Sequence, residues 1–144
     1  MTRLSAALAA LLAAALLVTA ACGGDDDDDA TDDQRVARVG SVSELATYAW
    51  IDAAGAGLYD YLSSDVTTTC TVDQVTEALA EHEQPTGWQQ VKDVEFQGDA
   101  EATATVILIY GSDRSEEEWG FKQESGDSWR VSHVPGLESC EAGE

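Results

Sequence analysis

A tyrosine and an aspartate four positions apart, Tyr48 and Asp52, are the first candidates for chemistry in this sequence. Residues at that spacing share a face of an α-helix. If an apolar cavity enclosed this face, Asp52 could act as a general base and Tyr48 could donate a hydrogen bond to developing charge. We favour a simpler interpretation, in which Asp52 is a solvated helix residue and Tyr48 lies at the edge of the core. Neither residue belongs to a recognised catalytic motif.

The two histidines add little support for catalysis. His133 alternates in phase with Trp129 and Val131, which predicts that it points inward. A single histidine on an apolar face more often makes a structural hydrogen bond than takes part in catalysis. The run Glu81–Glu83 holds the other histidine between two glutamates, and adjacent helix residues point in different directions, so it would need ligands from elsewhere to hold a metal. No Ser, Thr or Cys is placed beside a histidine by a familiar motif. We therefore expect no catalytic residue, metal or cofactor.

The first 22 residues have the parts of a bacterial export signal. Met1–Arg3 is short and positively charged, and Leu4–Ala21 is an uncharged apolar run. The end of that run, Val18–Cys22, resembles the lipobox of bacterial lipoproteins, although Thr19 stands where Leu or Val is usual. We therefore expect residues 1–21 to be a lipoprotein signal peptide and Cys22 to become the lipidated N-terminus. Cleavage without lipidation and an uncleaved membrane anchor are the alternatives.

Lipidation of Cys22 would also account for the odd number of cysteines. The chain has 3 cysteines, so Cys70 and Cys140 would remain as a pair. Outside the cytoplasm such a pair is expected to oxidise to a disulfide. Two free buried thiols or half a metal site are the alternatives, but neither cysteine has further ligands at zinc-like spacing.

The charge of the chain limits its partners. After residue 21, 6 basic and 28 acidic residues remain, so the formal charge is −22. Nucleic-acid affinity depends on Lys and Arg that neutralise phosphates, and anionic lipid head groups repel an acidic surface. The composition therefore excludes nucleic-acid binding as a main function, and leaves cationic partners, metal ions and neutral apolar ligands.

Residues 22–38 are predicted to form an acidic disordered tether, because their like charges repel and they have nothing apolar to bury. A calcium-binding loop is the less favoured alternative, because the aspartate run lacks the glycine-turn spacing of such loops. Residues 39–144 are then expected to form one folded domain.

The folded part begins with helical patterns. Ser41 and Glu44 have capping-box spacing and predict a first helix from Ser41. Its predicted apolar face comprises Val42, Leu45, Ala46, Ala49 and Ala53. Gly55–Gly57 predicts a turn, Leu58–Leu62 a short second helical segment, and residues 63–69 a loop. Thr71 and Gln74 form a second capping-box pattern and predict a further helix that ends before Pro85.

After Gly87 the apolar period changes from that of a helix to that of a strand. Strands are predicted over Trp88–Phe96, Ala102–Tyr110, Glu117–Gln123 and Trp129–Val134, joined by short turns. Trp119 and Phe121 share one face of the third strand, and the run Glu116–Glu118 is most simply its solvated entrance. Helices followed by a meander of strands predict an α+β fold, with N-terminal helices packed on a curved antiparallel sheet of about four strands.

This arrangement resembles the nuclear transport factor 2-like (SnoaL-like) superfamily, and in particular small actinobacterial lipoproteins with that fold. The resemblance rests on the stretch from Ala53 through Leu58–Leu62 to Cys70, on Trp88 at the entrance of the first long strand, and on the closing Trp129–Val131. It covers about residues 41–134. It implies a cone-shaped fold in which a bent sheet wraps a long helix around a pocket.

If such a cone exists, Tyr110, Trp119 and His133 would join Tyr48 and Asp52 as candidate pocket residues. Some enzymes of the superfamily use a carboxylate base with a tyrosine in this pocket, whereas many other members only bind, so the fold alone does not decide the function.

We therefore expect a lipid-anchored module at the extracytoplasmic face of the cell membrane that binds without catalysis. Its partner would be a small apolar ligand or another envelope protein. The alternative is an isomerase-like or hydratase-like enzyme that uses a pocket carboxylate.

Overall fold

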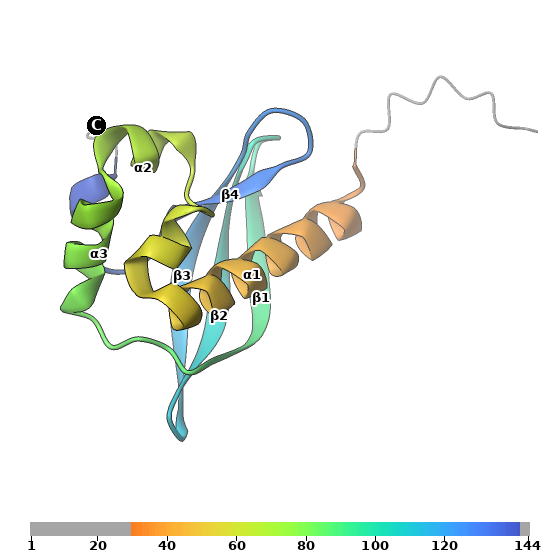
Figure 1. Ribbon diagram of the computed structural model, residues 1–144. Helices are drawn as coiled ribbons and strands as arrows, with labels where there is room; N and C mark the ends of the chain where they lie inside the picture. The colour runs from red at the N-terminus through yellow and green to blue at the C-terminus, as the bar shows by residue number, and fades with distance from the viewer. Residues whose placement is uncertain (1–29, 142–144) are drawn as a thin grey trace, which may run out of the picture.

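The structure, a computed structural model, describes residues 30–141. The predicted signal peptide, Cys22 and the aspartate run Asp25–Asp29 lie outside the described residues. Figure 1 shows helices followed by a meander of strands. The bounds are α1 Asp32–Tyr59, α2 Ser64–Thr69, α3 Val72–Ala80, β1 Gly87–Gln97, β2 Glu101–Tyr110, β3 Asp113–Gln123, β4 Trp129–His133 and the 3-10 turn η1 Glu138–Cys140.

The strands form one antiparallel sheet in the order β1-β2-β3-β4. Helix α1 crosses one face of this sheet and α3 packs beside α1, so the predicted α+β fold is confirmed (Figure 1). Strand β3 begins at Asp113 rather than near Glu117, because Gly111, with φ of 63°, closes a tight hairpin with Ser112. Register shifts in β1 and β4 add local bends to the sheet.

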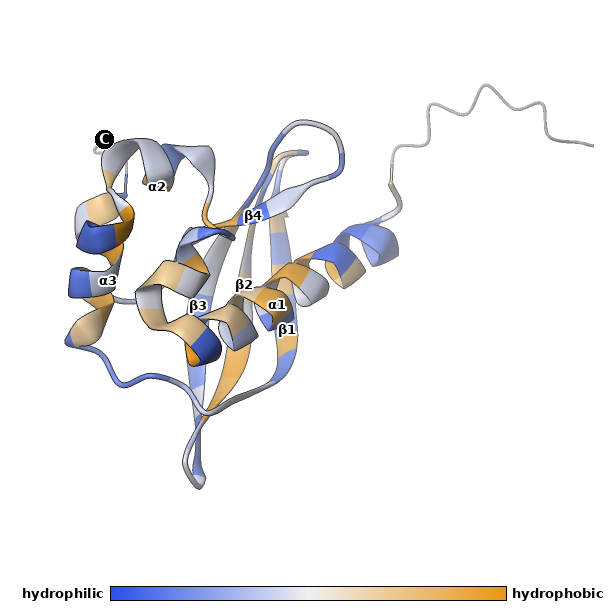
Figure 2. Ribbon diagram, in the orientation of Figure 1, coloured by the Kyte–Doolittle hydropathy of each residue, from blue (hydrophilic) through white to orange (hydrophobic). Residues whose placement is uncertain are grey.

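The core lies between α1 and the inner face of the sheet. Alternate residues of β2, from Ala102 to Leu108, are buried against the helices. Figure 2 shows apolar positions along α1 where it crosses the strands. The buried face of α1 carries Val39, Val42, Ala46 and Trp50 at intervals of three or four residues. Leu45 was predicted on this face but is 54% exposed, so the face is rotated from the predicted one.

Helix α1 begins earlier than predicted. Thr31 is its N-cap, and the Thr31 and Gln34 side chains exchange hydrogen bonds with each other's backbone N–H in a capping box. Two aspartates in the first turn, Asp32 and Asp33, stabilise the positive end of the helix dipole. Residues 32–38 are therefore helical rather than part of a disordered tether, and the predicted start near Ser41 was wrong.

Arg35 attaches this early part of α1 to the sheet. Its guanidinium carbon lies 3.9 Å from the centroid of the Phe96 ring, and Nη2 donates a hydrogen bond of 2.8 Å to the Gly98 carbonyl oxygen. A guanidinium over an aromatic face is held by cation–π attraction. This contact joins residues 61 positions apart, so no local sequence pattern could reveal it.

A kink divides α1 before its last turns. Ala53 and Ala54 have non-helical backbone angles, and Ala54 has a positive φ of 52°. The chain therefore bends two residues before the predicted turn at Gly55–Gly57. A short helical segment follows the kink as predicted, but it ends at Tyr59 rather than at Leu62. Glycine at position 55 instead lets α1 and α3 approach each other closely, since a Cβ at Gly55 would lie 2.5 Å from Thr76 Cα of α3.

The disulfide predicted between Cys70 and Cys140 is present, with a Cα–Cα distance of 5.3 Å. Cys70 ends α2, a helix that occupies the predicted loop 63–69, and Cys140 ends η1. The Tyr59 hydroxyl donates to the carbonyl oxygen of Cys70 at 3.2 Å. Helix α3 starts after Thr71 with the predicted Thr71–Gln74 capping box.

The start of α2 is capped by a residue distant in sequence. The N-cap residue Ser63 makes no side-chain capping bond, and its buried Oγ has no hydrogen-bond partner among residues 30–141. Glu124, after β3, accepts a hydrogen bond of 2.5 Å from the Ser64 N–H instead. This hydrogen bond lowers the pKa of Glu124 below its ordinary value.

We expect Glu124→Ala to lower the free energy of unfolding by about 1 kcal/mol at pH 7, less where solvent screens the charge. A carboxylate whose pKa is lowered in the folded state stabilises at neutral pH, and that contribution is lost as the pH falls through the folded-state pKa. The difference between variant and wild type should therefore shrink in strong acid. Urea unfolding across this pH range measures it.

Ser63→Ala is the matched control, because an N-cap serine normally contributes about 1 kcal/mol, whereas the Ser63 hydroxyl makes no capping bond. The Ser63 hydroxyl is buried and unpaired among the described residues, so its removal should leave the free energy of unfolding unchanged or raise it at every pH. A large loss in Ser63→Ala together with none in Glu124→Ala would contradict this account of the cap.

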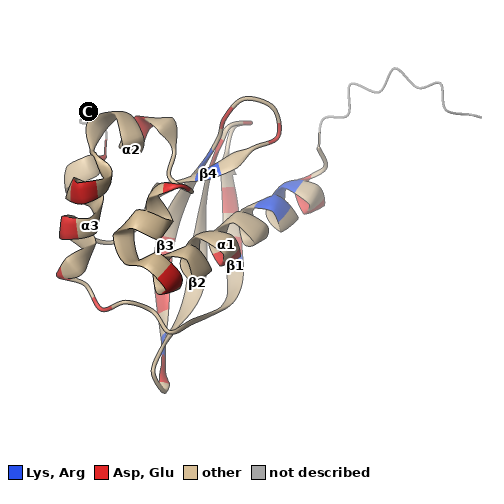
Figure 3. Cartoon of the chain, in the orientation of Figure 1, with Lys and Arg blue, Asp and Glu red and all other residues tan. Residues whose placement is uncertain are grey.

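Acidic residues are spread over the helices and the sheet, and basic residues lie at the start of α1 and on the strands (Figure 3). None of the helices within residues 30–141 combines the length and the apolar character needed to cross a membrane.

Candidate functional site

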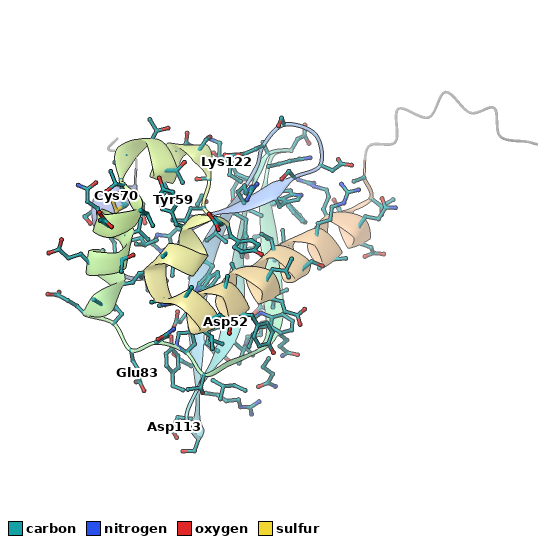
Figure 4. The ribbon with its side chains drawn as sticks, in the orientation of Figure 1. Asp52, Tyr59, Cys70, Glu83, Asp113 and Lys122 are labelled. Carbon is teal, nitrogen blue, oxygen red and sulfur yellow. A yellow bond between two sulfur atoms is a disulfide. The ribbon has the colours of Figure 1, made fainter. Side chains whose placement is uncertain are left out.

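A pocket of about 370 Å³ lies on the inner face of the sheet, at the β2–β3 hairpin end. We call it the hairpin pocket. Trp50 of α1 and Tyr110 at the end of β2 line it, together with Pro135 after β4. Glu83, in the loop after α3, and Asp113, at the start of β3, lie at the same end of the molecule (Figure 4). The remaining lining residues are His82, Arg114, Ser115 and Glu117.

Glu117 supplies the carboxylate that is held most firmly in this pocket. It stands opposite Val106 in the β2–β3 register, which places it on the inner face of the sheet with Trp119. The Tyr110 hydroxyl donates to Glu117 Oε1 at 2.5 Å, and the Trp119 indole N–H donates to Oε2 at 3.4 Å. Both oxygens are thus positioned, while an ionised carboxylate has about four acceptor sites in all. Acceptor capacity remains for a ligand.

Burial raises the pKa of Tyr110 well above its ordinary value, and the hydrogen bond and charge of Glu117 and the charge of Glu83 raise it further. The phenol therefore keeps its proton throughout the physiological range. It acts as a permanent hydrogen-bond donor to Glu117.

The charged residues at the pocket mouth differ in what holds them. Arg114 Nη1 donates a hydrogen bond of 2.8 Å to the Gln89 side-chain oxygen on β1. The His82 ring packs against Gly136, where an added Cβ would lie 2.6 Å from the imidazole. Neither Glu83 nor Asp113 takes part in a salt bridge within the described chain.

Of the five residues predicted from the sequence to line a pocket, Tyr110 lies at this one. Tyr48 is 45% exposed and Asp52 is also exposed, so neither is enclosed as a pocket base or donor would need to be. Trp119 is fully buried beneath the pocket and reaches it through its hydrogen bond to Glu117.

His133 was predicted to point inward by alternation with Trp129 and Val131, but a register shift in β4 interrupts that alternation. His133 stands opposite Gly120, its Nδ1 contacts the Glu141 carboxylate, and it does not line the hairpin pocket. A β-bulge turns the side chains beyond it to the opposite face of the sheet, and the periodicity of the sequence does not reveal where a bulge occurs.

Sequence reasoning missed Glu117, which it assigned to a solvated strand entrance. The sequence nevertheless indicated its position, because Glu117 lies two residues before Trp119 and four before Phe121 on the same strand, and both of these residues are buried. Strand alternation predicts that such a residue points inward. The two neighbouring glutamates, Glu116 and Glu118, are exposed.

Within residues 30–141, no group of three or more His, Cys, Asp or Glu side chains is arranged to hold a metal ion. A second, more open groove of about 400 Å³ lies between α1 and β4, lined by Val42, Leu45 and Trp129 among others. There Arg38 forms a salt bridge of 2.9 Å with Asp127, and the buried indole N–H of Trp129 has no hydrogen-bond partner in the part of the chain that the structure describes.

No protein-family model, curated protein or solved structure matches this chain.

Proposed function

We propose that this protein is a lipid-anchored, extracytoplasmic binding module whose ligand site is the hairpin pocket. The observation that carries the proposal is a pocket of about 370 Å³ with one inward carboxylate, Glu117, held by Tyr110 and Trp119. Pockets of roughly 300–1,000 Å³ with few placed polar groups are typical of small-molecule sites.

The location is supported by the lipobox-like Val18–Cys22 and by the disulfide Cys70–Cys140. Structural disulfides form mainly in oxidising compartments outside the cytoplasm. The superfamily resemblance to nuclear transport factor 2-like proteins remains part of the proposal. The helices packed against an antiparallel sheet are the arrangement that this resemblance implies.

Binding accounts for the pocket better than catalysis does. Asp52, the carboxylate considered as a base, is exposed, and Glu117 already accepts two hydrogen bonds. In the described chain no Ser, Thr or Cys side chain is hydrogen-bonded to a histidine, so no activated nucleophile is assembled there. An inward carboxylate fixed by two donors is suited to hold a ligand charge in one position.

Lipidation at Cys22 is tested by mass spectrometry of the chain recovered from the membrane fraction. We expect cleavage before Cys22 and an added diacylglyceryl mass on that residue. Cys22→Ala should abolish the added mass and the cleavage before residue 22, whereas Thr19→Leu should leave both unchanged. Recovery of the wild-type chain unlipidated in the medium would contradict the anchored location.

Ligand binding at the hairpin pocket is tested by filling it. Ser115 lines the pocket, whereas Ser112 is exposed in the hairpin turn. Ser115→Trp should therefore abolish the thermal stabilisation produced by a bound small molecule, and Ser112→Trp should leave that stabilisation unchanged. If Ser115→Trp retains the full stabilisation, the ligand binds elsewhere.

A further inference from the structure

The hairpin pocket carries an excess of negative charge. Three carboxylates line it, from Glu83, Asp113 and Glu117, against one guanidinium, that of Arg114. Arg114 is directed by its hydrogen bond to Gln89 on the neighbouring strand. The raised pKa of Tyr110, caused partly by Glu117 and Glu83, reflects the same negative potential. An anionic ligand would be repelled here, and a neutral apolar one would gain nothing from the negative charge of the pocket.

Aromatic side chains form part of the same pocket. Trp50 and Tyr110 both line it; Tyr110 is partly exposed, whereas Trp50 is only 3% exposed, so most of its side chain packs in the core. The face of a tryptophan or tyrosine ring attracts a cation, and this attraction strengthens where water is excluded. Aromatic walls beside a fixed carboxylate are the combination that recognises alkylammonium groups in proteins.

An inorganic cation fits these residues less well. Within the described chain the acidic side chains do not converge into a group that could hold a metal ion. A divalent metal needs several oxygen ligands at short distances, whereas an organic cation spreads its charge over a larger surface and needs one carboxylate with apolar contact.

The charge of the whole chain favours the same class of ligand. At a formal charge of −21, the protein attracts small cations over a long range, and a cleft lined by one sign of charge concentrates them. General attraction of this kind does not select a site, so the local residues must supply the selectivity. Glu117 supplies this selectivity from inside the pocket. Glu118, the next residue along β3, carries the same charge but is exposed on the other face of the strand.

We propose that the hairpin pocket binds a small organic cation with an alkylammonium head group, held by the Glu117 carboxylate beside Tyr110 and Trp50. This inference rests on the proposed function of the pocket as a ligand site, and it names the class of ligand.

The test is calorimetric titration of the full chain, in non-ionic detergent at physiological ionic strength, with two probes of the same shape. Choline carries a quaternary ammonium group, and dimethylbutanol is its neutral carbon analogue. We expect choline to bind at least about tenfold more tightly than dimethylbutanol. Glu117→Gln should weaken choline binding about tenfold, because it removes the charge and keeps a hydrogen-bond acceptor for Tyr110.

Glu118→Gln is the matched control, since it removes the same charge from the exposed side of the same strand. It should change choline affinity less than about twofold. Equal weakening by both substitutions would show diffuse attraction to a polyanion and overturn the inference. So would equal affinity for the two probes, although the pocket would then still be a ligand site. Binding of neither probe would also overturn the inference. The proposed function fails separately if a small molecule that stabilises the wild type stabilises Ser115→Trp to the same extent.

Discussion

Replacing Cys70 and Cys140 together by alanine is expected to lower the free energy of unfolding by about 4 kcal/mol. The bond closes a loop of 70 residues, and opening it restores the conformational freedom of that loop in the unfolded chain. Both cysteines are buried, at 7% and 1% exposure, so the lost sulfur packing adds to this effect. Guanidinium unfolding of the oxidised wild type and the double variant measures the difference.

The single variants provide a sharp control for the disulfide. Either Cys70→Ala or Cys140→Ala already breaks the bond, so each single variant should lose most of what the double variant loses. Added reductant should destabilise the wild type and leave the double variant unchanged. A double variant within about 1 kcal/mol of the wild type would show that the bond contributes little beyond core packing.

Gly57→Ala is expected to cost at least about 3 kcal/mol or to prevent folding. Because α1 bends at Ala53 and Ala54, its last turns approach the earlier part of the helix, and a Cβ at Gly57 would lie 1.9 Å from the Ala49 carbonyl oxygen. The obstructing atom belongs to the backbone of a helix, so it cannot rotate away as a side chain could. Thermal and urea unfolding measure the loss.

Gly40→Ala is the matched control within the same helix. Its Cβ would meet only the Val91 Cγ1 atom at 3.4 Å, and alanine favours the helix by about 1 kcal/mol over glycine. This variant should therefore be slightly stabilised. If Gly40→Ala and Gly57→Ala had equal effects, the close approach at Gly57 would not be the reason for the glycine there.

The kink itself explains why the glycines stand where they do. The residue with left-handed φ is Ala54, whereas Gly55 and Gly57 are needed because neighbouring backbone leaves no room for a Cβ. A sequence pattern of closely spaced glycines indicates a bend, but it cannot distinguish a special backbone angle from a close contact. That distinction depends on α3, which packs against α1 at Thr76.

Local patterns predicted much of the fold. The Thr71–Gln74 capping box, the alternation that buries Trp119 and Phe121, and the strand meander depend on contacts between near neighbours in the chain. The pairing of Cys70 with Cys140 followed from assigning Cys22 to lipid, which left two cysteines. These features were readable because helix and strand geometry repeats every few residues.

The candidate site was not predictable in the same way. The helix face that is buried was set by Val39 and Trp50 packing on the sheet, which leaves Asp52 exposed. Glu117 became a pocket carboxylate because Tyr110 and Trp119 direct their donors to it within the folded sheet.

By itself, the sequence determined that helices precede a meander of four strands, the acidic charge and the cysteine pair, since composition and short-range periodicity specify these. Only the tertiary structure decided how the first turns of α1 are attached to the sheet, because Arg35 reaches Phe96 across the fold. It also decided which carboxylate faces the pocket. Side chains from α1, the loop after α3 and the β2–β3 hairpin meet there, although they are far apart in the chain.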